Sequence, residues 1–236
     1  MNVVVCIKQV PDSWAEKQLQ PGDLTLDRAS VDAVLNDLDE YAVEAALQLV
    51  EAAGGSVTLL TVGPEAAGET IRKALSMGAD GGVHVVDDAL HGSDALATSQ
   101  VLAAALGTLE WDMVLLGSES TDARMSVIPA MLAERLGVPQ LTYASTITVD
   151  GASVTVERAT ETGVEVLAAS TPVVVSVVEK ANEPRYPSFK NIMAAKKKPV
   201  TTLSLADLQI DPSSVASRAP ILRSPTRRSA RRSPLG

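Results

Sequence analysis

The sequence predicts an α/β fold with an open, mostly parallel sheet flanked by helices. Short apolar runs alternate four times with amphipathic segments of helical period, which is typical of strand–helix units joined by right-handed crossovers. Hydrophobic residues make up 46% of the 236 residues, but aromatic residues make up only 3%. A core of Val, Leu, Ala and Ile suits a parallel sheet covered by helices better than it suits a β-sandwich.

The alternation occupies the first 136 residues. Each predicted strand is a short, continuously apolar run, which indicates burial on both faces of a sheet. These runs are residues 2–7, 56–62, 83–86 and 113–116. Each predicted helix repeats its apolar residues at intervals of three and four. The helices are residues 39–53, 64–77, 93–106 and 125–136. Residues 24–38 fit neither pattern.

The period changes after residue 144. Residues 145–149 and 153–157 alternate polar and apolar side chains on either side of Asp150-Gly151, a pair that favours a tight hairpin turn. Residues 164–168 and 173–178 follow, so we expect an antiparallel ribbon that returns the chain to the sheet. No internal repeat or low-complexity segment precedes residue 212. We therefore expect residues 1–211 to form one domain.

Charge is distributed unevenly along the chain. There are 20 Lys and Arg against 29 Asp and Glu, a formal net charge of −9. Six of the arginines and none of the acids follow Asp211, so residues 1–211 carry a net charge of −15. A strongly acidic body argues against a general nucleic-acid partner.

The sequence also points to a compartment. No apolar run reaches the ~20 residues that span a bilayer, and the N-terminus lacks the basic and apolar regions of a secretory signal. The one cysteine, Cys6, leaves no partner for a disulfide within the chain and excludes a cysteine metal cluster. We expect a cytoplasmic protein without membrane insertion.

The chain offers little that resembles an enzyme active site. His84 lies within an apolar strand pattern and His91 is expected to open a helix beside Gly92, so a sheet residue and a loop residue are simpler interpretations than a general base. No Gly-x-Ser-x-Gly elbow and no acid pair of defined spacing occur. We expect no catalytic residues and no metal site.

Nucleotide binding is better supported. Residues 117–122, G-S-E-S-T-D, follow a predicted strand and precede a predicted helix, where main-chain N–H groups can hold a phosphate. The stretch lacks the lysine of a P-loop and the glycines of a G-x-G-x-x-G fingerprint. A polar connection with an Asp cap therefore stays an alternative.

Residues 181–199, A-N-E-P-R-Y-P-S-F-K-N-I-M-A-A-K-K-K-P, combine rigidity, apolar bulk and positive charge. Pro184 and Pro187 fix two φ angles and predict an extended segment. A helix with Ser188 as its N-cap is expected to follow, with lysines closing it at the negative end of the helix dipole. A docking device and an ordinary surface helix both fit this pattern.

The motif N-E-P-R-Y-x-x-F-x-x-I-M-x-A-K-K-K resembles the signature of electron transfer flavoprotein β subunits, in which a recognition loop anchors onto partner dehydrogenases. K-Q-V-P-D near the N-terminus and G-E-T-I-R-x-A-L-x-M-G-A-D at residues 68–80 carry the same resemblance, which ends at about Asp211. It implies an adenine-nucleotide alpha-hydrolase-like, Rossmann-like form of the α/β fold. The recognition residues that it implies are Asn182, Glu183, Pro184, Arg185, Tyr186, Phe189, Ile192, Met193, Lys196, Lys197 and Lys198.

The resemblance further implies that AMP binds, without reacting, in the crevice beside the first and fourth strands. Cys6 and Val62 would line the adenine pocket, and residues 118–126 would hold the phosphate. The full set of implied cofactor-binding residues is Cys6, Asn36, Asp37, Leu38, Asp39, Val62, Gly117, Ser118, Glu119, Ser120, Thr121, Asp122, Ala123, Arg124, Met125, Ser126, Val127 and Ile128.

Two positions depart from the family's pattern. Val127-Ile128-Pro129 stands where many relatives have Gln-Thr-Gly, so phosphate binding would rest on main-chain N–H groups with Arg124 or Ser126. Ala159 stands where relatives often carry a glutamate that pairs with the other subunit, so that pairing is not carried over.

The function implied by the resemblance is that of an electron carrier rather than an enzyme. An α and a β subunit share one FAD, held mainly by α, which accepts electrons from flavin-dependent dehydrogenases such as acyl-CoA dehydrogenases of fatty acid β-oxidation. The electrons then pass to electron transfer flavoprotein–quinone oxidoreductase or a similar acceptor. Residues 10–14 would be the β contribution to the flavin environment. Two alternatives are a bifurcating-type β subunit with a second FAD in place of AMP, and a stand-alone nucleotide-binding stress-type module.

Residues 212–236 match neither the body of the chain nor the resemblance. Their Arg/Ser/Pro bias is typical of a disordered segment, so we expect a flexible tail whose removal at Asp211 leaves the melting temperature unchanged.

Overall fold

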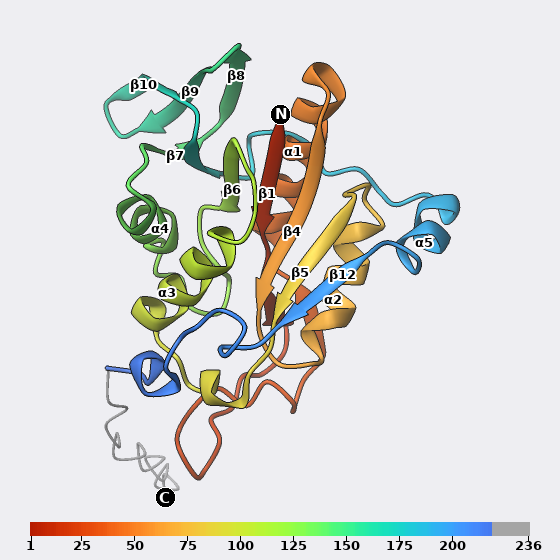
Figure 1. The fold of residues 1–236 in the computed structure, drawn as a ribbon, viewed down its shortest axis with the longest axis vertical. Coiled ribbons are helices and arrows are strands. Elements are labelled where there is room, and N and C mark those ends of the chain that lie inside the picture. Colours follow the sequence, from red (N-terminus) through yellow and green to blue (C-terminus); the bar gives the residue numbers. More distant parts are fainter. Residues whose placement is uncertain (219–236) are drawn as a thin grey trace, which may run out of the picture.

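The computed structural model describes residues 1–218, and its centre is a seven-stranded sheet (Figure 1). Every pair of neighbouring strands runs parallel, which confirms the predicted fold class. The order across the sheet is β12-β5-β4-β1-β6-β11-β7. The strands are β1 (Asn2–Cys6), β4 (Ser56–Val62), β5 (Gly81–Val85), β6 (Met113–Gly117), β7 (Gln140–Ala144), β11 (Val173–Val177) and β12 (Val200–Leu203).

Helices cover both faces of this sheet. On one face lie α1 (Asp37–Ala53) and α2 (Ala67–Leu75), and on the other lie α3 (Ala95–Leu106) and α4 (Ile128–Leu136). Alternate residues of β1 divide between the two cores: Val3 and Val5 join the core under α1 and α2, whereas Val4 and Cys6 join the core under α3 and α4. Burial on both faces explains why the strand sequences are continuously apolar.

The predicted antiparallel ribbon is a separate three-stranded sheet. It consists of β8 (Thr146–Asp150), β9 (Ser153–Thr160) and β10 (Gly163–Ser170), and β11 then returns the chain to the main sheet. Val154 and Val156 of β9 are buried in the core on the α1 side. The ribbon therefore adds to the same hydrophobic core instead of forming a second domain.

Four strands were not predicted. β7 and β12 form the two outer edges of the main sheet, and their sequences, Q-L-T-Y-A and V-T-T-L, are half polar. The other two, β2 (Gln9–Pro11) and β3 (Ala33–Leu35), pair with each other over three residues. Edge strands and short ladders bury less surface, so they lack the continuous apolar run by which the central strands were recognised.

A short helix, α5 (Phe189–Ala195), lies at the right in Figure 1, close to α2. The predicted cap is confirmed, because the Ser188 hydroxyl accepts a hydrogen bond from the Asn191 N–H at 3.2 Å. The helix ends at Ala195, so the three lysines that were expected in its last turn follow it instead.

The packed structure continues past Asp211. A 3₁₀ helix, η2 (Pro212–Val215), packs on α3, and the side chain of Val215 is fully buried in the core on that side. Ser93 and Gln100 donate hydrogen bonds to the Val215 carbonyl and the Ser214 hydroxyl, at 3.1 and 3.0 Å. The boundary expected at Asp211 is therefore too early, and the tail prediction for residues 219–236 lies outside the described residues. Within residues 1–218, no helix has both the length and the hydropathy needed to cross a membrane.

Candidate functional site

The carboxyl ends of β1, β4 and β6 meet at the lower edge of the sheet in Figure 1. Three separate parts of the expected cofactor site come together there. Gly117 ends β6, residues 118–127 connect β6 to α4, and Asn36 precedes α1, whose first turn packs beside β6. Ligands bind at this edge in open α/β sheets, so the arrangement suits a small-molecule site.

Asp39 joins two of the central strands at this edge. Its buried carboxylate accepts hydrogen bonds from the main-chain N–H of Lys8 at 2.8 Å and of Gly117 at 3.3 Å. Burial raises the pKa of Asp39 to about 7, although hydrogen bonds from Asn36, Lys8 and Gly117 oppose the shift. A Cβ at position 117 would lie 2.7 Å from Asp39 Oδ1 and 2.8 Å from Leu38, so only glycine allows α1 to approach β6 this closely.

Asn36 fixes the start of the loop that follows β6. Its side-chain amide donates to the Glu119 carbonyl and its oxygen accepts from the Thr121 N–H, both at 3.0 Å. The Asn36 N–H donates to the Lys8 carbonyl at 3.0 Å. Asn36 is 1% exposed, so it acts as a buried bridge between β1, the start of α1 and the loop.

Asp122 anchors the same loop through charge. Its side chain is 1% exposed and pairs with Lys8 Nζ at 2.8 Å and with an Arg28 guanidinium nitrogen at 2.7 Å. Burial alone would raise the pKa of Asp122, but the charge of Lys8 and hydrogen bonds from Lys8, Ser120 and Arg28 hold it well below its ordinary value. The carboxylate therefore stays ionised and ties residues 118–127 to β1 and to the connection that carries Arg28.

The end of this loop offers main-chain donors to a ligand. The N–H groups of Ser126 and Val127, just before α4, donate no hydrogen bond within residues 1–218. Arg124 and Ser126 have φ angles of 49° and 55°, in the left-handed region that non-glycine residues seldom adopt. The Ser126 hydroxyl donates to Glu119 Oε2 at 3.1 Å, which holds the turn in this conformation. The donor set fits a phosphate group bound through the backbone.

The remaining expected cofactor residues surround this loop at different depths. Cys6 is buried beneath the edge, and burial raises the pKa of its thiol, which makes it an inert packing residue. Val62 is half-buried at the end of β4. Half-buried members are Leu38, Glu119, Ser120, Thr121 and Ile128; Ser118 is buried; Asp37, Ala123, Arg124 and Met125 are exposed.

Comparisons with known proteins identify the family of the chain. A family model described as "Electron transfer flavoprotein domain" matches residues 23–208. The chain belongs to the electron transfer flavoprotein β-subunit family. An electron transfer flavoprotein subunit beta from Mycobacterium leprae (strain TN) is 57% identical over 216 residues, which cover 89% of this chain and 81% of the relative. One from Thermoanaerobacterium thermosaccharolyticum is 38% identical over 212 residues, with the same coverage.

A further relative carries a different name. The "Acryloyl-CoA reductase electron transfer subunit gamma" of Anaerotignum propionicum is 38% identical over 216 residues, which cover 90% of this chain and 80% of that protein. The family model and these relatives each cover most of the chain.

The recognition residues expected for a β subunit fall into two groups. Tyr186 is 98% exposed and Phe189 is 79% exposed, and Ile192 and Met193 are exposed beside them on α5. Glu183, Lys196 and Lys197 are exposed as well. The second group faces inward: Asn182, Pro184, Arg185 and Lys198 are half-buried. Only the first group presents its side chains fully to solvent.

Sequence reasoning missed several residues that build the β-subunit site. Lys8 and Arg28 hold Asp122, and Arg72 on α2 donates to one carbonyl at the end of α5 and one just after it. Lys8 lies in the motif K-Q-V-P-D and Arg72 in the motif G-E-T-I-R, both of which carried the family resemblance. Lys8 and Arg72 could therefore have been found as polar residues inside a family motif. Arg28 could not, because it lies in a stretch without any pattern.

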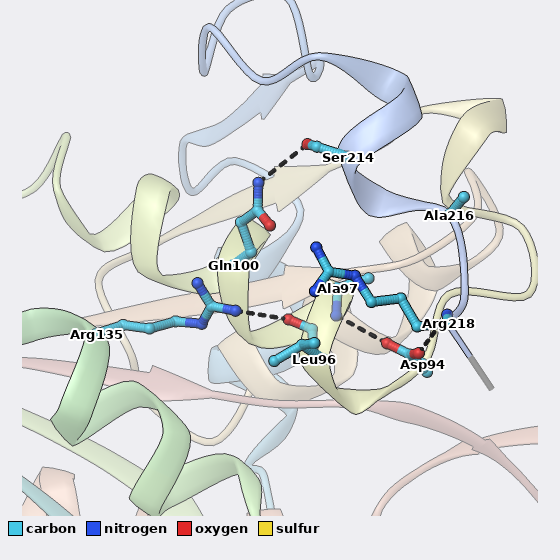
Figure 2. Close-up of a pocket in the computed structure, with 8 residues that line it drawn as sticks. All are labelled: Asp94, Leu96, Ala97, Gln100, Arg135, Ser214, Ala216 and Arg218. Carbon is cyan, nitrogen blue, oxygen red and sulfur yellow. Dashed lines mark hydrogen bonds between the residues drawn. The ribbon is translucent and has the colours of Figure 1, made fainter.

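A separate cavity of about 170 Å³ lies between α3, α4 and the segment after η2. Figure 2 shows Arg135 of α4 reaching the Leu96 carbonyl, to which it donates at 3.1 Å, while Arg218 enters from the C-terminal side. Asp94, the N-cap of α3, accepts from the N–H groups of Ala97 and Arg218. The cavity is formed by segments far apart in the chain, so no sequence pattern predicted it.

The two histidines were interpreted as structural. His84 is buried in β5, and its Nε2 lies 3.2 Å from the Gly63 carbonyl; burial lowers its pKa. His91 ends the short 3₁₀ helix η1 (Asp88–Leu90) and pairs with Asp23 at 2.7 Å, so the expectation that it opens a helix was wrong. Residues 1–218 contain no cluster of His, Cys, Asp and Glu side chains that could hold a metal ion.

Proposed function

We propose that this β subunit binds AMP as a structural nucleotide and transfers electrons only in a complex with an α subunit. The FAD of that complex, held mainly by α, accepts electrons from flavin-dependent dehydrogenases such as acyl-CoA dehydrogenases. It passes them to electron transfer flavoprotein–quinone oxidoreductase or a similar acceptor. The observation that carries the proposal is the loop of residues 118–127, a braced backbone with free N–H groups at the carboxyl edge of the sheet of an electron transfer flavoprotein β subunit.

The AMP phosphate would be held by this backbone. The N–H groups of Ser126 and Val127 have no partner within the described residues, and Arg124 is the exposed cation beside them. Lys8 and Arg28 are already paired with Asp122, so they neutralise the carboxylate and position the loop. Asp122 was expected among the cofactor contacts; we propose instead that it acts through the loop that it braces.

The adenine would lie toward the ends of β1 and β4. Val62 is half-buried there, and Cys6 lies beneath it in an apolar layer, which fits a flat aromatic base better than a charged group. Asn36 and Asp39 are fully engaged within the protein and would shape the floor of the site.

The flavin, when bound, supplies the redox chemistry of the complex. This chain would contribute residues 10–14, which follow β1 at the same edge of the sheet. The Trp14 side chain is 95% exposed and the Trp14 N–H is held by Asp12 Oδ1 at 2.9 Å. A large aromatic side chain held on the surface in this way suits a contact with a partner subunit or its cofactor.

Co-expression with an α subunit tests the proposal. The two chains should purify together as a yellow complex whose flavin is reduced by an acyl-CoA dehydrogenase and its substrate. This chain expressed alone should be colourless. If no α subunit is retained, or if the complex is yellow but no flavin-dependent dehydrogenase reduces it, the proposed function is wrong.

A further inference from the structure

The segment that leads into α5 is fixed to α1 by one arginine. Arg185 Nε donates to Glu44 Oε2 at 2.7 Å, and its two terminal nitrogens reach Glu44 at 3.0 Å and Glu51 at 2.6 and 3.1 Å. The main-chain N–H of Arg185 also donates to Glu44 at 3.2 Å, and Asn182 donates to the Tyr41 carbonyl at 3.0 Å. The guanidinium is thus hydrogen-bonded to two carboxylates, Glu44 and Glu51, which both lie on α1.

The geometry makes this contact more than a surface ion pair. The Glu44 side chain is 5% exposed, and the Glu44 and Glu51 positions are two turns apart on α1. Burial on its own would raise the pKa of Glu44, but hydrogen bonds from Arg185 and Gln48 lower it, so the carboxylate is ionised and needs its cation. The planar guanidinium makes four hydrogen bonds to the two carboxylates in a fixed fork, which the three donors of a lysine ammonium, all on one atom, cannot reproduce.

The other end of the segment is fixed to α2. Arg72 donates to the carbonyls of Ala195 and Lys198, at 2.8 and 2.7 Å. Lys198 in turn directs its ammonium group to the carbonyls of Leu75, Gly78 and Ala79 beyond the end of α2. Cations therefore fasten both ends of the segment, although the sequence suggested that its positive charge faces outward.

Between these two attachments, the chain presents apolar side chains to solvent. Tyr186 adjoins Arg185 directly, and Phe189 opens α5 four residues after it. A seven-residue helix has little stability of its own, so the position of Phe189 depends on what holds the ends of the segment. A docking surface that is already ordered loses less conformational entropy on binding.

We propose that Arg185 is a positioning residue for dehydrogenase docking: by joining Glu44 and Glu51 it holds Tyr186 and Phe189 in the conformation that the partner binds. This inference rests on the proposed function, because it takes the dehydrogenase as the occupant of the α5 surface. Arg185 itself is half-buried against α1 and contacts no partner in this mechanism.

Steady-state kinetics of the αβ complex with an acyl-CoA dehydrogenase tests the proposal. Arg185→Lys keeps the charge but loses the four-bond guanidinium fork, so the KM for the complex should rise about tenfold while kcat and flavin content stay close to the unaltered values. Hydrogen exchange at residues 186–193 should become faster in the same variant. Arg135→Lys is the matched control, since Arg135 also donates to neighbouring groups but lies on the opposite face of the sheet.

Glu51→Gln separates positioning from a direct charge effect. Glu51→Gln weakens the hydrogen bonds between Arg185 and position 51 and leaves the charge of Arg185 less neutralised. If Arg185 acts by positioning the segment, the KM for the complex should rise roughly threefold. If Arg185 instead attracted an acidic partner through its own charge, the same variant would lower KM and overturn the proposal. Unchanged KM in Arg185→Lys would also overturn it, provided that Phe189→Ala raises KM. If Phe189→Ala leaves KM unchanged as well, dehydrogenases do not dock on the α5 surface, and the proposal fails with that assignment.

Discussion

Asp122→Asn tests whether a buried carboxylate holds the nucleotide loop. The substitution keeps the shape of the side chain but removes the charge that pairs with Lys8 and Arg28. Hydrogen bonds between charged groups contribute about 1.5–3 kcal/mol each. The two cations are 38% and 44% exposed and can be hydrated again, so the lower value applies to each contact. The free energy of unfolding should therefore fall by about 3 kcal/mol.

The assay is urea denaturation of the chain at pH 7.5, followed by its pH dependence. For a chain of this length the loss corresponds to a melting temperature lower by roughly 6–12 °C. The folded-state pKa of Asp122 lies below its value in the unfolded chain, about 3.9, so its stabilisation is complete above about pH 4 and is lost as the pH falls further. Asp122→Asn should reduce this loss of stability in acid.

Asp150→Asn, at the exposed end of β8, is the control; it should change neither the stability at pH 7.5 nor its pH dependence. A loss below about 1 kcal/mol for Asp122→Asn would mean that water replaces the carboxylate at little cost. In that case the loop is held by Asn36 and the backbone alone, and the reasoning is refuted.

Three further predictions concern the exposed face of α5, the attachment of the chain after α5 to α2, and the C-terminal end of the described residues. Phe189→Ala should lower kcat/KM for electron transfer from a dehydrogenase by about 30-fold, the equivalent of ~2 kcal/mol, with flavin retained; loss of flavin would assign Phe189 to the core. Lys198→Ala should lower the melting temperature, since it removes the side-chain donor that three carbonyls share, whereas Lys197→Ala should not; equal melting temperatures would contradict the structure. Truncation after Asp211 should destabilise the chain by about 2 kcal/mol because it exposes the site of Val215, and an unchanged melting temperature in thermal unfolding would restore the sequence-based boundary.

The main sheet could be predicted because burial on both faces leaves an unambiguous sequence pattern. Val3 to Cys6 alternate between two cores, so every position of β1 after Asn2 is apolar. The same argument explains the failures. β12 at the sheet edge needs an apolar side chain at only some positions, and Thr201 and Thr202 are exposed there. A hydrophobic-run criterion cannot distinguish such a strand from a loop.

The candidate site could be predicted by position but not by role. The family resemblance implied ligand contacts at 36, 39 and 122, yet the structure engages all three within the protein. Arg185 and Lys198 were likewise expected to face a partner, and they fasten the segment to α1 and α2. A polar side chain in a motif has the same sequence signature whether it binds a ligand or braces the backbone that does, and only the contacts separate these two roles.

The central claim is tested most directly by counting the nucleotides in the purified αβ complex. The complex would be denatured, and FAD and AMP would be separated by chromatography and measured per αβ pair. The account predicts one FAD and one AMP, and no flavin in this chain purified alone. Two FAD and no AMP per pair, or a flavin bound to the isolated chain, would contradict it.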